Sequence, residues 1–321
     1  MKQAGHGINC LIAIDKPIGI TSQGAVSRVR RALGVKRVGH AGTLDPAATG
    51  VLVVGVGQAT RLLGLLTLDE KGYEAAIAFG TETTTDDEEG DVVRRGVLGA
   101  RLLDEAYARE SLAALVGECD QVPPAFSAIS VGGRRSYERA RAGEEVVLPP
   151  RHVEIYQADL LAIEGDETAP VWRCSFRVSK GTYIRAIARD LGRAVGSAAH
   201  LGGLVRTSSG MVMIGQCVPV DDIVERGADV LAACTVDPAR ALGLPVRLID
   251  KEELAEVANG RRIPAGYVLD IAGEGGGLRE PRGGECVSLV HGDRLYGVWA
   301  RHGDILSSEA TFPEGIEGVR P

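Results

Sequence analysis

The sequence predicts an α+β fold in two parts, a larger domain over residues 1–240 and a small β-barrel domain over residues 241–321. Up to about residue 240, strand patterns and helical spacings are interspersed along the chain. After that point, short β-like runs are separated by glycines, which is typical of a small barrel. With 321 residues, the chain is long enough for two domains and a sizeable core.

The first elements are predicted from apolar runs and from residues that turn or cap the chain. We expect strands at 9–14, 51–56 and 72–79, and helices from Thr21 or Ser22 to about Leu33 and from about Gln58. Thr or Ser at that point is a common helix cap. The stretch 81–91 is polar and acidic, and we expect an exposed loop there.

The middle of the chain continues the mixed pattern. We expect strands at 153–163 and 171–179, and helices at 104–116, 136–141 and 183–195. The last helix is predicted from the apolar spacing of Ile184, Ile187, Ala188 and Leu191. Cys174 falls in an alternating strand pattern and is expected to be a small core residue.

The C-terminal part begins with a short helix and continues as β-structure. The helix starts at Asp250 and ends near Asn259-Gly260. Strands are expected at Gly266–Ile271, at Cys286–His291, at Arg294–Ala300 and from Ile305 onward. This pattern leaves a non-specific small β-domain open as an alternative.

Composition limits the class of protein. The chain is 45% hydrophobic, and no apolar run reaches membrane-spanning length or resembles a signal peptide, so we expect a cytoplasmic protein. Its six cysteines form no close pair, which argues against a zinc site or a disulfide framework. The net charge is −7, yet basic residues gather at 28–37 and 134–141. These clusters are either a nucleic-acid surface or solvated helix faces.

One carboxylate stands in a turn built mainly from small residues. Glycines at 39, 42 and 50 frame Asp45, and Pro46 fixes the chain after it. An apolar run follows directly. This arrangement would present Asp45 as a nucleophile or a general acid or base. The alternative is that Asp45 caps a helix whose first residue is Pro46.

The segment Gly-His-Ala-Gly-Thr-Leu-Asp-Pro-Ala-Ala-Thr-Gly at 39–50 resembles the catalytic motif of the TruB family of tRNA pseudouridine synthases. Ala41 and Ala47 depart from that motif, which usually has Thr and Leu there. Further segments resemble family motifs in the family's order, at Asp15–Ser22, Lys71–Glu74, Gln121–Ala128, Ser179–Arg185 and Leu204–Thr207. Phe126 replaces the usual Tyr, Ser130 a frequent Lys, and Val205 the usual Arg. The C-terminal part resembles a PUA domain, an RNA-binding β-barrel.

The resemblance implies a bacterial-type enzyme whose catalytic domain has a central mixed, largely antiparallel sheet flanked by helices. It implies that Asp45, Tyr73 and Arg185 are catalytic. Asp45 would be the attacking carboxylate and Arg185 its ionic partner, while Tyr73 would stack on the target base or move a proton. It further implies that His40, Tyr73, Tyr183, Leu204 and Lys16 contact the substrate or shape its pocket.

The implied activity converts uridine to pseudouridine at position 55 in the T-loop of tRNA, after the base is flipped out of its stack. Whether Asp45 acts at the uracil ring or at the sugar stays open. No cofactor, metal or obligatory protein partner is required, and we expect a monomer that binds the T-arm. The alternatives are a guide-RNA-dependent pseudouridine synthase and a tRNA-binding or tRNA-folding module that needs no catalysis.

Overall fold

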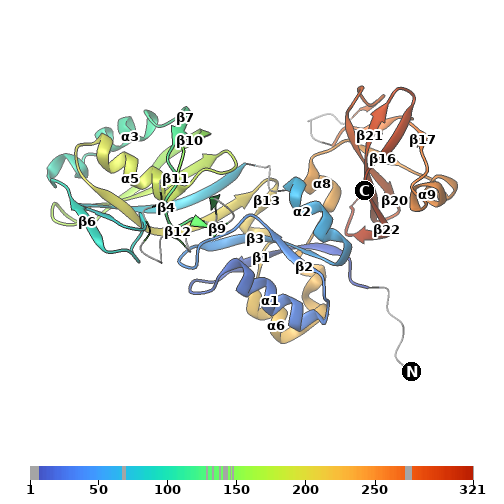
Figure 1. Cartoon of the computed structure of the whole chain (residues 1–321), viewed down its shortest axis with the longest axis horizontal. Helices are drawn as coiled ribbons and strands as arrows, with labels where there is room; N and C mark the ends of the chain where they lie inside the picture. The colour runs from blue at the N-terminus through green and yellow to red at the C-terminus, as the bar shows by residue number, and fades with distance from the viewer. Residues whose placement is uncertain are drawn as a thin grey trace. The chain divides into compact units, whose positions relative to one another are not determined.

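The chain forms two compact units in the computed structural model, which describes residues 7–66, 70–127, 129–131, 134–136, 139, 144, 146, 148–271 and 277–320. Unit 1 comprises Met1–Asp69 and Ser208–Pro321, and unit 2 comprises Glu70–Thr207 (Figure 1). Helices pack on mixed sheets in which antiparallel pairs predominate. The predicted α+β class is therefore confirmed. The helix expected at 136–141 lies mostly outside the described residues.

Unit 1 is built around strand β1 (Cys10–Lys16). β1 pairs antiparallel with β3 (Thr49–Val56) along its whole length, and β3 pairs antiparallel with β2 (Val38–Ala41). β14 (Val218–Pro219) runs parallel to β1, whereas β15 (Thr235–Val236) runs antiparallel to it. These long pairings fix the start of β3, which directly follows the Asp45 loop.

Both faces of this sheet are covered, because successive side chains in a strand point to opposite sides. On one side, Ile12 and Val54 pack with helices α1 (Ser22–Leu33) and α6 (Val220–Arg226), which lie together in Figure 1. On the other, Leu11 and Val53 share a core with the 3-10 helix η1 (Gly57–Leu62) and with C-terminal strands. The sheet that carries the Asp45 loop is thus rigid on both faces.

Local sequence signals set the boundaries of α1 as predicted. The Thr21 hydroxyl accepts a hydrogen bond from Gly24 N at 2.9 Å, and the helix ends at Gly34 with φ 65°. The helix predicted from about Gln58 is confirmed: it begins as the 3-10 helix η1 and continues as α2 (Leu63–Leu66), which is one turn long. Gln58 N lies in the first turn of η1, where it has no intrahelical acceptor, and it donates to Asn9 Oδ1 at 2.7 Å.

Unit 2 is an antiparallel sheet with two helices on it. The strands are ordered β7 (Gly117–Gln121), β10 (Arg151–Glu164), β11 (Val171–Val178), β4 (Lys71–Phe79) and β12 (Ala199–Ser209). Helix α3 (Glu105–Ala113) packs on β10, α5 (Ile184–Ala194) packs on β4, and the two helices touch. Trp172 anchors this core: it is fully buried and its indole Nε1 donates to Leu102 O at 2.7 Å. Cys174 is fully buried on β11, as predicted.

The C-terminal strands of unit 1 have a core of their own. They are ordered β17 (Ile263–Pro264), β22 (Ile305–Glu317), β21 (Arg294–His302), β20 (Cys286–His291), β16 (Val246–Leu248), β18 (Val268–Leu269) and β19 (Leu278–Arg279). Helix α9 (Lys251–Ala258) is capped by Asp250, as expected, and Trp299 lies at the centre of the cluster. The PUA-like assignment and a domain boundary at residue 240 stay predictions. In the part of the chain that the structure describes, every helix is too short or too polar to cross a bilayer.

Candidate active site

The Asp45 loop joins β2 to β3 and is tied to the start of α1 by one side chain. The Ser22 hydroxyl donates to Leu44 O at 3.0 Å and accepts from Leu44 N at 2.8 Å. Ser22 is 2% exposed, so water does not compete for these bonds. The residue directly before Asp45 is therefore fixed through both of its backbone polar groups.

A second set of bonds holds Pro46, directly after Asp45. Its carbonyl accepts from Gly19 N at 2.9 Å and from the Lys16 ammonium at 3.4 Å. The same ammonium donates to the carbonyls of Pro17 and Ile20, at 2.9 and 2.8 Å. Lys16 is fully buried and braces the loop. Its expected role toward the substrate stays a prediction.

These bonds explain why Asp45-Pro46 does not begin a helix. In an α-helix starting there, Pro46 O would accept from Gly50 N. Instead, Gly50 N donates to Asp15 Oδ1 at 3.1 Å, and a two-residue turn leads into β3. The alternative of a helix cap at Asp45 is wrong. Asp45 itself is half-buried, as is His40 on β2, opposite Val54.

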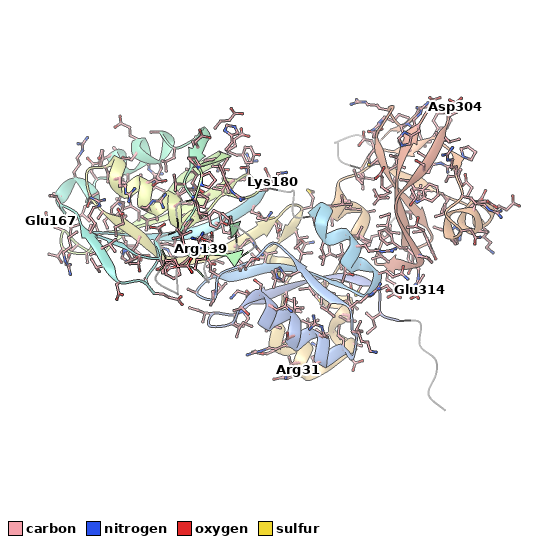
Figure 2. The ribbon with its side chains drawn as sticks, viewed as in Figure 1. Arg31, Arg139, Glu167, Lys180, Asp304 and Glu314 are labelled. Carbon is pink, nitrogen blue, oxygen red and sulfur yellow. The ribbon has the colours of Figure 1, made fainter. Side chains whose placement is uncertain are left out.

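In unit 2, Tyr183 lies in the turn between β11 and α5. The Gln121 side chain brackets it, since its amide donates to Tyr183 O at 3.1 Å and its carbonyl accepts from Tyr183 N at 2.8 Å. The turn starts just past the end of β11, where Figure 2 labels Lys180. Tyr73 is buried on β4 and Leu204 is half-buried on β12, the neighbouring strand.

Arg185, on the first turn of α5, is buried with its side chain 5% exposed. Its guanidinium donates to Thr85 O at 2.9 Å and Phe126 O at 3.0 Å, and it lies 3.5 Å from the Asp87 carboxylate. Phe126 is held through its backbone carbonyl, so this contact does not need the tyrosine hydroxyl that the sequence lacks. The pairing of Arg185 with Asp45 stays a prediction.

The acidic stretch 81–91 was expected to be an exposed loop, which is wrong for its first half, whereas Glu88, Glu89 and Asp91 are exposed. Its first residues form strand β5 (Thr81–Thr83), paired with β6 (Val92–Arg95). Glu82, Asp86 and Asp87 are buried. Burying acids is costly unless cations accompany them. Helix α5 supplies those cations, through Arg193 to Glu82, Arg189 to Asp86 at 2.9 Å, and Arg185 to Asp87.

Asp86 is the most constrained of these acids. Its φ of 61° places it in the left-handed region, where its carbonyl accepts from Leu201 N at 3.0 Å. Burial raises the pKa of Asp86 to about 6, although Arg189 and Arg185 act in the opposite direction. By contrast, the hydrogen bond from Arg193 keeps the pKa of Glu82 below its usual value. The surroundings therefore raise the pKa of Asp86 and lower that of Glu82.

The sequence reasoning missed this ionic cluster, although a signal was present. Arg185, Arg189 and Arg193 recur every four residues and so lie on one face of the predicted helix. An arginine stripe on a helix with a strongly apolar opposite face needs an acidic counterpart, and residues 82–87 provide one. The sequence alone does not show that the arginines of this helix and the acids at 82–87 lie together in the fold.

A family model described as TruB family pseudouridylate synthase (N terminal domain) matches residues 30–184. A protein of Thermobifida fusca (strain YX) named tRNA pseudouridine synthase B is 46% identical over 266 residues, which cover 80% of this chain and 87% of that protein. One of the same name from Mycobacterium bovis (strain BCG / Pasteur 1173P2) is 43% identical over 265 residues, covering 83% and 86%.

Solved structures share the fold at lower identity. A chain of the archaeal box H/ACA sRNP Nop10-Cbf5 complex superposes with a TM-score of 0.68 and 22% identity, covering 95% of this chain and 86% of that chain. A chain of an H/ACA RNP bound to a substrate RNA containing 2'-deoxyuridine gives 0.67 and 21%, covering 94% and 84%.

Replacing Ser22 should loosen the loop and destabilise the protein. Ser22→Ala leaves the buried N–H and C=O of Leu44 without their partner, which costs about 1–3 kcal/mol per unsatisfied group. We expect urea unfolding to show a loss of about 2–4 kcal/mol. Ser27→Ala is the matched control on α1, because its hydroxyl only donates back to Gln23 O. Equal free energies of unfolding for the two variants would contradict a stabilising role of the Ser22–Leu44 hydrogen bonds.

Asp86 should make stability fall as the pH rises. Its pKa is higher in the folded chain, about 6, than the ordinary 3.8, so the folded state holds the proton more tightly between these values. The stability that the folded chain gains from binding this proton is fully present below about pH 4 and is lost by about pH 7. Relative to wild type, Asp86→Asn should gain up to ~3 kcal/mol over this range. Urea unfolding of wild type and Asp86→Asn from pH 4 to 7 measures this difference, and Asp91→Asn, at an exposed acid, is the control. If wild type and Asp86→Asn show the same pH dependence of the free energy of unfolding, the prediction is wrong.

Proposed function

Because the chain belongs to the TruB family of pseudouridylate synthases, we propose that it converts uridine 55 in the tRNA T-loop to pseudouridine, with Asp45 as the attacking carboxylate. The chain is an isomerase that acts on tRNA. The observation that carries the finer proposal is the fixed Asp45 loop. Ser22 holds the residue before this half-buried carboxylate, and Gly19 and Lys16 hold the residue after it.

The reaction needs a positioned carboxylate. It breaks the bond between uracil N1 and the ribose, turns the base, and joins its C5 carbon to the same sugar carbon, while the C5 proton leaves and N1 takes up a proton. No atom is gained and no redox change occurs, so covalent catalysis by one side chain suffices. Asp45 can attack the uracil ring, attack the sugar, or remove a sugar proton, and each route uses an ionised Asp45.

The uridine must leave its stack to reach Asp45, which costs a few kcal/mol. Tyr73 is the proposed stacking partner, because base–aromatic stacking contributes about 1–3 kcal/mol. Its hydroxyl is also the proposed carrier of the C5 proton. Tyr183 and Leu204 would line the uracil pocket, and His40 would fill the space that the flipped base vacates in the RNA.

Arg185 would be the ionic partner of Asp45 and would balance its negative charge during the reaction. Two hydrogen bonds and one ion pair within unit 2 hold the Arg185 guanidinium, so it would be oriented before substrate arrives. Preorganised charge of this kind needs no rearrangement during the reaction.

Asp45→Asn should abolish turnover while tRNA binding persists, because the amide is a poor nucleophile but has nearly the same shape. We expect a rate loss of about 10⁴-fold or more, measured by tritium release from C5-labelled uridine in a tRNA transcript. Asp304→Asn, an exposed acid labelled in Figure 2, is the control. Substantial turnover by Asp45→Asn would refute the assignment.

A transcript with cytidine in place of uridine 55 should yield no pseudouridine, whereas the unmodified transcript should yield one per molecule. The test uses bare transcript without guide RNA or accessory protein, and the product is located by chemical mapping. Product at another position would refute the T-loop assignment but leave the synthase activity intact. Activity only with a guide RNA would favour the guide-dependent alternative.

A further inference from the structure

A second candidate binding site lies in unit 1, in residues outside the Asp45 loop. It is a cavity of about 420 Å³ between the β12–β13 turn, β15, helix α8 (Pro238–Leu242) and the chain near residue 320; β13 (Val212–Met213) and α8 are labelled in Figure 1. Its lining includes Met211, Val212, Gln216, Asp237, Arg240 and Arg320. Small-molecule sites have volumes of about 300–1,000 Å³, so a single nucleotide is of suitable size.

Two arginines and one carboxylate line this cavity, and the Arg320 guanidinium donates to Thr235 O at 3.2 Å. Asp237 Oδ1 accepts from Ala239 N at 2.9 Å and Arg240 N at 3.1 Å, and its Oδ2 accepts from Arg320 N at 2.8 Å. Backbone donors thus occupy Asp237, which is buried and caps α8. The Arg240 side chain is 68% exposed, and its Nε lies 3.8 Å from Asp237, too far for a hydrogen bond. The site therefore has excess positive charge.

An apolar wall stands beside these arginines. Gly210 has φ 55° and turns the chain so that Met211 is 71% exposed. Val212 beneath it is buried. Exposed methionine is an adaptable contact surface, because its side chain is flexible and polarizable. A ligand with an anionic group at one end and a flat or apolar body at the other would match both parts of the cavity.

We propose that this cavity binds one nucleotide of the tRNA substrate, with its phosphate between Arg240 and Arg320 and its base or sugar against Met211. The proposal rests on the function proposed above, which makes tRNA the polyanion that this protein meets. Arginine forks suit phosphate oxygens, which they bind in bidentate geometry. The same chemistry could come from a free nucleotide, so the test includes both sources.

Methionine NMR tests the apolar wall directly. The chain has three methionines, Met1, Met211 and Met213, so a sample labelled with ¹³C at the methionine methyl gives three signals. Met211→Leu assigns the reporter. Unmodified tRNA transcript should shift the Met211 signal, and uridine 5′-monophosphate should shift it only weakly. In Arg240→Ala/Arg320→Ala the transcript should still bind but leave that signal in place.

The salt dependence of tRNA binding tests the arginine pair. Removing one phosphate contact should flatten the plot of log affinity against log salt by about 0.7–0.9. We expect each single variant, Arg240→Ala and Arg320→Ala, to weaken binding roughly tenfold at low salt, since both hold one phosphate. Arg109→Ala is the matched control, an exposed arginine paired with Glu105 in unit 2.

The outcomes separate this proposal from the proposed function. If wild type forms pseudouridine but the Met211 signal and the salt slope do not respond as expected, the cavity is not an RNA site. If the monophosphate moves Met211 and the transcript does not, the ligand is a free nucleotide and the proposal is wrong. If wild type forms no pseudouridine at all, the proposed function fails, whatever the NMR shows.

Discussion

The two hydrogen bonds between the Ser22 hydroxyl and the backbone of Leu44 are the constraint on which the candidate active site depends. A reacting carboxylate must be held to within a fraction of an ångström, and in this loop of mostly small residues the two bonds add to the packing of the buried Leu44 and Ala48. Ser22 transfers the rigidity of α1 to the loop, and the sheet beneath transfers the rigidity of two cores. The glycines allow the loop to turn, and the Ser22 hydroxyl fixes the backbone directly before Asp45.

Unit 2 applies a similar principle to charge. Three acids that would be exposed in an isolated hairpin are buried there, because α5 meets them with an arginine every four residues. Arg185 and Arg189 also donate to backbone carbonyls, and Arg193 donates to both oxygens of Glu82, so the cations are oriented as well as neutralised. An oriented Arg185 is what the proposed pairing with Asp45 requires. The acidic stretch 81–91 therefore holds Arg185, a residue of the proposed active site, in position.

Local signals account for what the sequence could predict. Thr21 and Asp250 mark helix starts through their own side chains, and the apolar spacing of α5 defines a buried face. β2 and β12 were missed, because glycine, polar and basic residues interrupt their alternation and only their neighbours make them strands. The Asp45 loop was recognisable from its motif, whereas the burial of Asp86 depends on Arg189, about a hundred residues further along.

Two Asp-Pro pairs show how tertiary hydrogen bonds override the tendency of this dipeptide to start a helix. Asp237-Pro238 behaves as the dipeptide predicts: the carboxylate caps α8, and Ala241 N donates to Asp237 O at 2.9 Å. Asp45-Pro46 has the same local chemistry but forms no helix, because Gly19 occupies the carbonyl of Pro46 and Asp15 takes the amide of Gly50. Tertiary contacts thus decide whether the same dipeptide starts a helix or a turn that leads into a strand.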